Sequence, residues 1–261
     1  MKIEHSFRQS WLKDAMTCPE RARRNLAGTL PDRETDAAAV GTAVHAGIEA
    51  YLGSDKSMTY REVLTVCEDT FQEIEAHPSF VWSKYSHRTS MGLIDTFLAN
   101  WWEIGDKFDP ISLEYGFDEV LYEDDERIIR LKGTIDLIDK NLGLADWKTS
   151  GRGTYEKWEY ERWAIQPTVY TWAYHSATAK EGEKFPFTYY VIHKGGVQEF
   201  TVWRDQSDWK WLEQRALQYA RMIEANLDEW PMHDNHALCS AKWCPAWDTC
   251  KGANYKTEQS E

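Results

Sequence analysis

The sequence has no long hydrophobic run: none of its apolar stretches approaches the roughly 18 residues that a membrane-spanning helix needs. Its first residues, Met-Lys-Ile-Glu-His-Ser-Phe, lack the hydrophobic centre of a secretory signal. It contains no repeat, no low-complexity block and no linker rich in proline, glycine or serine. These absences argue against a membrane protein and a string of small domains. We expect one domain, in the cytoplasm of a bacterial, archaeal or virus-infected host cell.

Net positive charge is also lacking, since 43 acidic side chains against 30 Lys and Arg leave a formal net charge of −13. A protein that coats DNA regardless of sequence is usually basic, so this class is disfavoured. An enzyme acting on nucleic acid is not excluded, because bound metal ions supply positive charge and local basic patches guide a phosphate backbone. Two groups of basic residues are candidates for such patches, although each also fits a solvated helix face: Arg21, Arg23 and Arg24, and Lys148, Arg152, Lys157 and Arg162.

Cysteine is scarce, and its count of five is odd, which fits poorly with a closed disulfide framework. In a reducing cytosol, clustered cysteines more often bind metal. Cys239, Cys244 and Cys250 share a short irregular segment, and Cys18 can join them because the ends of a domain often lie close together. Four thiolates can hold a [4Fe–4S] cluster or a tetrahedral Zn²⁺, and their spacing does not decide between the two. Cys67 lies on an expected helix and is interpreted as a small buried hydrophobe.

The hydrophobic pattern predicts helices first and strands later. Apolar residues recur every four positions from Val40 to Leu52, which predicts a helix over 37–52. The helix over 8–26 is expected to place Trp11, Leu12, Ala15 and Met16 on one side, and the helix over 208–227 to turn Leu227 inward. Further helices are expected over 60–76, 89–106 and 163–177, and strands over 111–121, 128–139, 143–149, 187–193 and 197–203, the last two joined at Gly195-Gly196. This order predicts an α/β or α+β fold with an N-terminal helical elaboration.

The segment from Leu131 to Ser150 reads as two strands, and each strand ends in charge. Asp136 interrupts the first apolar run, and Asp146 and Lys148 end the second. Residues two apart on a strand share a face, so Asp146 and Lys148 project together, and Asp136 can lie close to both if the strands pair. Two carboxylates and one ammonium group form a minimal site for a divalent metal ion and a phosphate.

This pattern resembles the signature of the PD-(D/E)XK nuclease superfamily, in Asp136 followed by Asp146-Trp147-Lys148. Two further segments resemble motifs of its RecB-like exonuclease branch: Gly41-Thr-Ala-Val-His45 and Gln166-Pro-Thr-Val-Tyr170. The cysteines resemble those of the iron–sulfur form, found in viral exonucleases and the CRISPR-associated adaptation nuclease. The matches follow the family's order and span residues 18–250.

The resemblance implies a restriction-endonuclease-like core, with a mixed central sheet flanked by helices. One domain over 1–261 is expected to contain a mainly helical part (1–110), the nuclease core (111–230) and a cysteine-rich segment (231–255) joined by Cys18. The [4Fe–4S] cluster is then favoured over structural Zn²⁺. The implied cofactor at the reaction site is Mg²⁺ or Mn²⁺.

The same resemblance assigns roles to residues of the site. Asp136 and Asp146 bind the metal ion together with His45 and the main-chain oxygen of Trp147. Lys148 orients or deprotonates the attacking water, or stabilises the transition state. Three accessory candidates, each of which also fits an ordinary surface position, are Glu114, Gln166 and Tyr170.

The function implied is a metal-dependent DNA exonuclease that acts on ends of linear double- or single-stranded DNA in recombination, repair or viral DNA processing. A recombinase, helicase or single-strand-binding protein is the expected partner. A CRISPR-adaptation nuclease that trims spacer precursors is one alternative. A non-catalytic DNA-binding module is another, which the intact Asp136, Asp146 and Lys148 argue against.

Overall fold

The structure, a computed structural model, describes residues 2–31, 33–152, 165–232, 239–241 and 243–252. The chain divides into two compact units. Unit 1 contains residues 1–32, 117–133 and 207–261, and unit 2 contains residues 33–116 and 134–206. Strands β4 (Pro110–Glu123) and β5 (Arg127–Asp139) contribute residues to both. No helix in the described part of the chain is long and apolar enough to cross a membrane.

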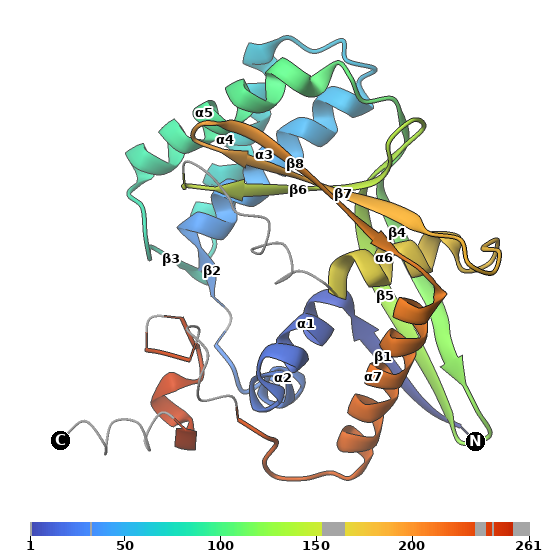
Figure 1. Cartoon of the computed structure of the whole chain (residues 1–261). Coiled ribbons are helices and arrows are strands. Elements are labelled where there is room, and N and C mark those ends of the chain that lie inside the picture. The colour runs from blue at the N-terminus through green and yellow to red at the C-terminus, as the bar shows by residue number, and fades with distance from the viewer. Residues whose placement is uncertain (1, 32, 153–164, 233–238, 242, 253–261) are drawn as a thin grey trace. The chain divides into compact units, whose positions relative to one another are not determined.

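Unit 2 is built on a mixed sheet (Figure 1). The end of β5 pairs antiparallel with β6 (Gly143–Ser150), β6 pairs parallel with β7 (Phe185–His193), and β7 pairs antiparallel with β8 (Gly196–Arg204). Because a parallel pair needs a crossover connection, a helix lies between β6 and β7 in the sequence: α6 (Ile165–His175). The structure confirms the predicted class, a mixed central sheet flanked by helices.

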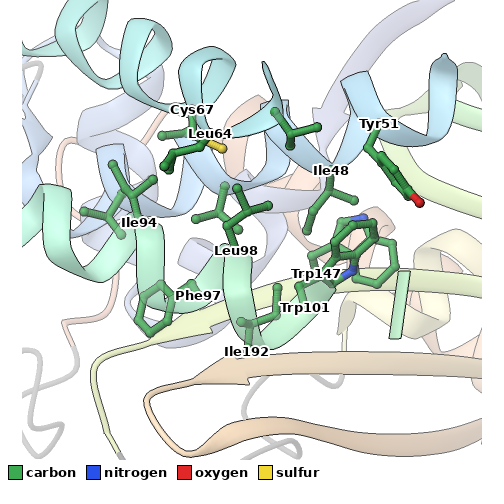
Figure 2. Packing of buried hydrophobic residues seen from close by; sticks show 14 of the residues in the cluster. Ile48, Tyr51, Leu64, Cys67, Ile94, Phe97, Leu98, Trp101, Trp147 and Ile192 are labelled. Atoms are coloured by element: carbon green, nitrogen blue, oxygen red, sulfur yellow. The ribbon is translucent and has the colours of Figure 1, made fainter. Parts of the chain in front are cut away.

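Three helices cover one face of this sheet: α3 (Asp36–Gly53), α4 (Tyr60–Glu75) and α5 (His87–Gly105). Figure 2 shows their apolar side chains gathered over the strands, with Trp101 of α5 beside Trp147 of β6. The two indole rings meet edge to face, with centroids 5.7 Å apart. Such aromatic pairs contribute about 0.5–1.5 kcal/mol beyond the area that they bury. Cys67 is fully buried in this core, as predicted.

Helix α6 packs on the opposite face of the sheet. Tyr190 and Ile192 of β7 belong to the core under α3–α5, whereas the Tyr170 ring of α6 contacts Phe187, with centroids 5.8 Å apart. Successive strand residues point to opposite faces, so residues of even number in β7 face α3–α5 and Phe187 faces α6. The sheet of unit 2 is therefore covered on both faces.

Unit 1 contains β1 (Ile3–Arg8), which pairs parallel with the first half of β5. Its helices are α1 (Gln9–Thr17), α2 (Pro19–Leu26) and α7 (Gln206–Glu224). Of α7, all residues but the first, Gln206, belong to unit 1. The ring of Trp11 stacks on Phe7 and meets Tyr219 of α7 edge to face. β1 was not predicted, because its six residues bury only two side chains and look polar in the sequence. Two other short strands, β2 (Glu34–Thr35) and β3 (Phe80–Val81), pair in unit 2.

The expected helix over 8–26 is wrong in one respect, because it is broken at Cys18. The backbone there is extended, with φ −153° and ψ 102°, and Pro19 opens the next helix. A residue before proline avoids the helical region, which explains the break. Trp11, Leu12 and Ala15 are buried, whereas Met16, expected on the same side, is 37% exposed. Leu227 was expected to point inward but is 54% exposed and lies beyond the end of α7.

A buried carboxylate joins α2 to the C-terminal part of unit 1. Glu20 accepts hydrogen bonds from Arg23 Nε at 2.8 Å, Arg24 Nε at 2.7 Å and the Trp230 main-chain nitrogen at 2.9 Å. Burial alone would raise the pKa of Glu20, but these hydrogen bonds lower it to about 2. Arg23 and Arg24 are thus engaged within unit 1, which favours the helix-face interpretation of this basic group over a DNA-binding patch.

This network predicts a loss of stability in acid. The folded pKa of Glu20 lies below its ordinary value of 4.5, so its contribution is complete above pH 4.5 and is lost as pH falls towards about 2. Glu20→Gln should lower the free energy of unfolding at pH 7 by about 1–3 kcal/mol, and by less at pH 3. Denaturant unfolding at both values measures this, with the exposed Glu4→Gln as control. An equal loss at both pH values would contradict the account.

Candidate active site

Two neighbouring strands of unit 2 bring the predicted carboxylates together. Leu137 of β5 pairs with Ala145 of β6, so Asp136 and Asp146 lie one position beyond this antiparallel pair. The Trp147 main-chain N–H donates to Asp136 Oδ2 at 3.2 Å, which ties the first carboxylate to the second strand. The Trp147 side chain points into the core, so Asp146 and Lys148 project from the other face of β6.

Asp146 is almost completely buried, with 1% of its surface exposed. Its Oδ1 accepts a hydrogen bond of 2.5 Å from Gln166 Nε2, and its Oδ2 forms an ion pair with the ammonium group of Lys148. A buried carboxylate without such partners would be costly, so Lys148 and Gln166 explain how Asp146 remains inside the protein. Gln166 lies in the first turn of α6 and approaches Asp146 from a separate part of the chain.

Tyr170 extends this network along the same face of α6. Its side chain is 6% exposed. Burial and the charge of Asp146 raise the pKa of Tyr170, while a hydrogen bond with Gln166 acts in the opposite direction. Gln166 therefore links Tyr170 to Asp146. The four-residue spacing indicated a shared face, but nothing in the sequence indicated that Gln166 would contact Asp146 directly.

The Asp136 side chain carries an electrostatic penalty. Burial and the nearby charge of Asp146 raise its pKa well above the ordinary value, and the charge of Lys148 and the Trp147 N–H only partly oppose them. A bound cation between the two carboxylates would remove this penalty. Asp136 and Asp146 therefore fit a hard divalent ion such as Mg²⁺, which needs only one or two carboxylates and otherwise keeps waters.

His45 of α3 reaches the same carboxylate. Its Nδ1 lies 3.3 Å from Asp136 Oδ2. Burial lowers the pKa of His45 to about 4, against an opposing effect of the Asp146 charge, so the imidazole is neutral at pH 7. A neutral imidazole can bind a metal ion. A hydrogen bond with the main chain of Trp147 also places His45 beside the second strand.

Glu114 is the more peripheral of the predicted residues. It lies in β4 with φ 47°, a left-handed conformation that is unusual for a residue other than glycine. Partial burial and the charges of Glu49 and Asp146 raise the pKa of Glu114, so its carboxylate interacts electrostatically with the site. Among the described residues, however, no three His, Cys, Asp or Glu side chains are gathered closely enough to form a ready-made metal site. The divalent-ion site thus rests on the pair Asp136 and Asp146.

Three of the four cysteines of the predicted cluster are neighbours in unit 1. Burial, together with the proximity of Cys239 and Cys250, raises the pKa of Cys244, while the charge of Arg21 acts in the opposite direction. All four thiols are free, and no three metal-ligating side chains of the described residues are gathered here either. Four thiolates are suitable ligands for an iron–sulfur cluster or for zinc, but the described thiols are not gathered closely enough to form a ready-made metal site.

Helix α2, which begins directly after Cys18, contacts the cysteine-rich segment. Arg24 Nη1 donates to Thr249 Oγ1 at 2.8 Å, next to Cys250. The Glu20 main-chain N–H donates to the Pro231 carbonyl at 3.2 Å. Helix α2 and the described part of the C-terminal segment are therefore adjacent within unit 1. Lys157 and Arg162 of the second predicted basic group lie outside the described residues.

Comparisons with known proteins agree with this geometry. A family model described as the PD-(D/E)XK nuclease superfamily matches residues 6–251. Among solved structures, a "Putative exonuclease" from Eubacterium rectale has a TM-score of 0.53 and 17% sequence identity, covering 89% of this chain and 86% of that chain. At this identity the likeness shows the fold alone.

A second structure, that of SSO0001, is 14% identical over 94% of this chain and 96% of that chain, but its TM-score of 0.40 is too low to support an argument. No curated protein matches the chain closely enough to count.

Proposed function

This chain belongs to the PD-(D/E)XK nuclease superfamily, and we propose that it is a metal-dependent exonuclease that hydrolyses phosphodiester bonds at the ends of linear DNA. The observation that carries the proposal is the placement of Asp136 and Asp146 on adjacent strands, with Lys148 on the same face as Asp146. Nuclease chemistry needs these three groups beside one phosphate. The exonuclease assignment rests on the resemblance of the motifs to the RecB-like branch.

Nucleases of this superfamily generally use Mg²⁺ or Mn²⁺. In this chain Asp136 and Asp146 would hold such an ion, with His45 and the main-chain oxygen of Trp147 as further ligands. When bound, the ion supplies positive charge to the reacting phosphate and makes water more acidic. The raised pKa of Asp136 supports this assignment, because it marks a buried site where one more positive charge is favourable.

The other side chains of the site have roles that follow from their contacts. Lys148 presents an ammonium group next to Asp146, where it can donate hydrogen bonds to the phosphate or to the attacking water. Gln166 fixes the orientation of Asp146 by its hydrogen bond, and Tyr170 fixes Gln166. Gln166 and Tyr170 are therefore proposed as positioning residues. Glu114 is proposed to add negative charge at the edge of the site.

Removal of the lysine should abolish cleavage without unfolding the protein. Lys148→Ala and Asp146→Asn should each reduce cleavage of linear DNA in Mg²⁺ or Mn²⁺ by at least about 100-fold, because the first removes the ammonium group beside the reacting phosphate and the second removes a carboxylate that would hold the metal ion. The assay uses end-labelled linear DNA beside covalently closed circles. The matched control is Lys184→Ala, an exposed lysine before β7. Circular dichroism checks that each variant is folded.

The outcomes separate the parts of the proposal. Loss of linear DNA only, absent in both site variants, supports an exonuclease, and the position of the label gives its polarity. Cleavage of closed circles would contradict the exonuclease assignment. Wild-type cleavage rates in Lys148→Ala would remove Lys148 from the mechanism. No cleavage by the folded, metal-loaded wild-type protein would favour the DNA-binding module.

We also propose that Cys18, Cys239, Cys244 and Cys250 hold a [4Fe–4S] cluster that joins the two ends of unit 1. Protein purified without oxygen should contain about four iron atoms per chain and absorb near 400 nm. Cys250→Ser should lose this iron and unfold more easily, because metal binding is coupled to folding. Cys67→Ala is the control, since this thiol is buried in unit 2. Stoichiometric zinc would instead indicate the structural-zinc alternative, and a stable protein without metal would contradict both.

A further inference from the structure

A segment of the chain far from the nuclease motifs lies against the end of the catalytic strand. The main chain at Gly151, directly after β6, is so close to the Tyr85 hydroxyl that a Cβ atom at this position would overlap it. The same Cβ position lies 3.9 Å from Lys84 Nζ. A larger residue at this position would force the Tyr85 side chain to move. Residues 84–85, which precede α5, are therefore neighbours of the strand that carries Asp146 and Lys148.

Three exposed basic residues belong to segments that lie side by side at this end of the strand. Lys84 and Arg152 flank Gly151, and Lys194 lies in the turn between β7 and β8. The Lys194 main-chain N–H donates to the Arg152 carbonyl at 3.3 Å, which fixes the two segments side by side. We call Lys84, Arg152 and Lys194 the basic corner. A local concentration of positive charge is notable in a chain whose net charge is −13.

The Lys84 segment is held in place by a buried carboxylate. Asp36, the first residue of α3, is fully buried and accepts main-chain hydrogen bonds from Ser83 at 2.6 Å, Lys84 at 3.1 Å and Tyr85 at 2.5 Å. Burial alone would raise the pKa of Asp36, but these hydrogen bonds lower it, so the carboxylate stays ionised. The main chain that presents Lys84 is thus preorganised, which reduces the entropy lost on binding.

The basic corner lies close to the reaction site along β6. Gly151 follows Lys148 by three residues, and an extended chain of this length spans about 10 Å. A DNA strand carries one phosphate per roughly 3.4 Å of its axis, so about three nucleotides span the distance along β6 from Lys148 to the segment that carries the basic corner. Lysine and arginine side chains that neutralise phosphates supply most of the sequence-independent affinity for DNA.

We propose that the basic corner binds the phosphate backbone of the DNA substrate beside the scissile bond and thereby holds the strand along the end of β6. This inference rests on the proposed nuclease function and adds to it the path of the strand. The contacts are to phosphates, so binding is independent of base sequence. The chain carries this positive surface locally, while its overall negative charge limits binding of DNA elsewhere.

The test replaces the two lysines and leaves the site intact. Lys84→Gln/Lys194→Gln, in the Lys148→Ala background that prevents cleavage, should bind DNA roughly tenfold more weakly. The slope of log affinity against log salt should fall by about 1.4–1.8, since each lost phosphate contact accounts for about 0.7–0.9. The matched control is Lys184→Gln, an exposed lysine at the opposite end of the parallel strands β6 and β7. Fluorescence anisotropy measures both quantities.

Cleavage by otherwise wild-type protein gives a second readout. The double variant should have a raised KM on long linear DNA and a nearly unchanged kcat, because the corner binds the strand away from the reacting phosphate. The difference from wild type should disappear on DNA too short to reach the corner. Equal melting temperatures show that the variants are folded.

Failure of this inference is distinct from failure of the proposed function. Wild-type protein that cleaves DNA, with a double variant identical to Lys184→Gln in affinity, salt slope and KM, would overturn the basic corner alone. Wild-type protein that neither binds nor cleaves any DNA would overturn both proposals.

Discussion

The interaction on which the site depends is the buried carboxylate of Asp146, held between the amide of Gln166 and the ammonium group of Lys148. A carboxylate that is 1% exposed is costly to bury without such partners. The partners come from the same strand and from α6, so the position of that helix on the sheet and the chemistry of the site are fixed together. Burial and the nearby charge of Asp146 together raise the pKa of Asp136.

The alternation of side chains along β6 connects this site to the core of unit 2. Ala145 and Trp147 face the aromatic core under α3–α5, where Trp147 meets Phe108 edge to face with ring centroids 4.9 Å apart. Asp146 and Lys148 consequently face the other side. A shift of one residue in the register of β6 would turn the charged side chains into the aromatic core and the indole toward the face that carries the site, so packing of the core specifies the orientation of the reacting groups.

Much of this arrangement could be predicted from the sequence, because it depends on local patterns. The strands over 128–139 and 143–149 and the helix over 37–52 are found close to their expected bounds, and the geometry brings His45 next to Asp136. The contact of Gln166 with Asp146 could not be derived, since it depends on how α6 crosses the sheet. The approach of Tyr85 to Gly151 was equally hidden, because no local pattern relates these distant segments.

The errors also have physical causes. The break at Cys18 follows from the restriction that Pro19 places on the preceding residue, a local signal that the amphipathic pattern over 8–26 obscured. β1 has too few buried residues to stand out, and it is specified by pairing with β5, which is distant in the sequence. Long-range pairing of this kind is visible only in the folded chain.

The central proposal is that Asp136 and Asp146 form one binding site for a divalent cation. Isothermal titration calorimetry of Mn²⁺ into wild-type protein and into Asp136→Asn tests this claim without any substrate. We expect saturable binding to the wild-type protein that is lost or weakened at least tenfold in the variant, and release of protons on binding at mildly acidic pH, because the pKa of Asp136 is raised. Equal Mn²⁺ binding by the two folded proteins would contradict the account.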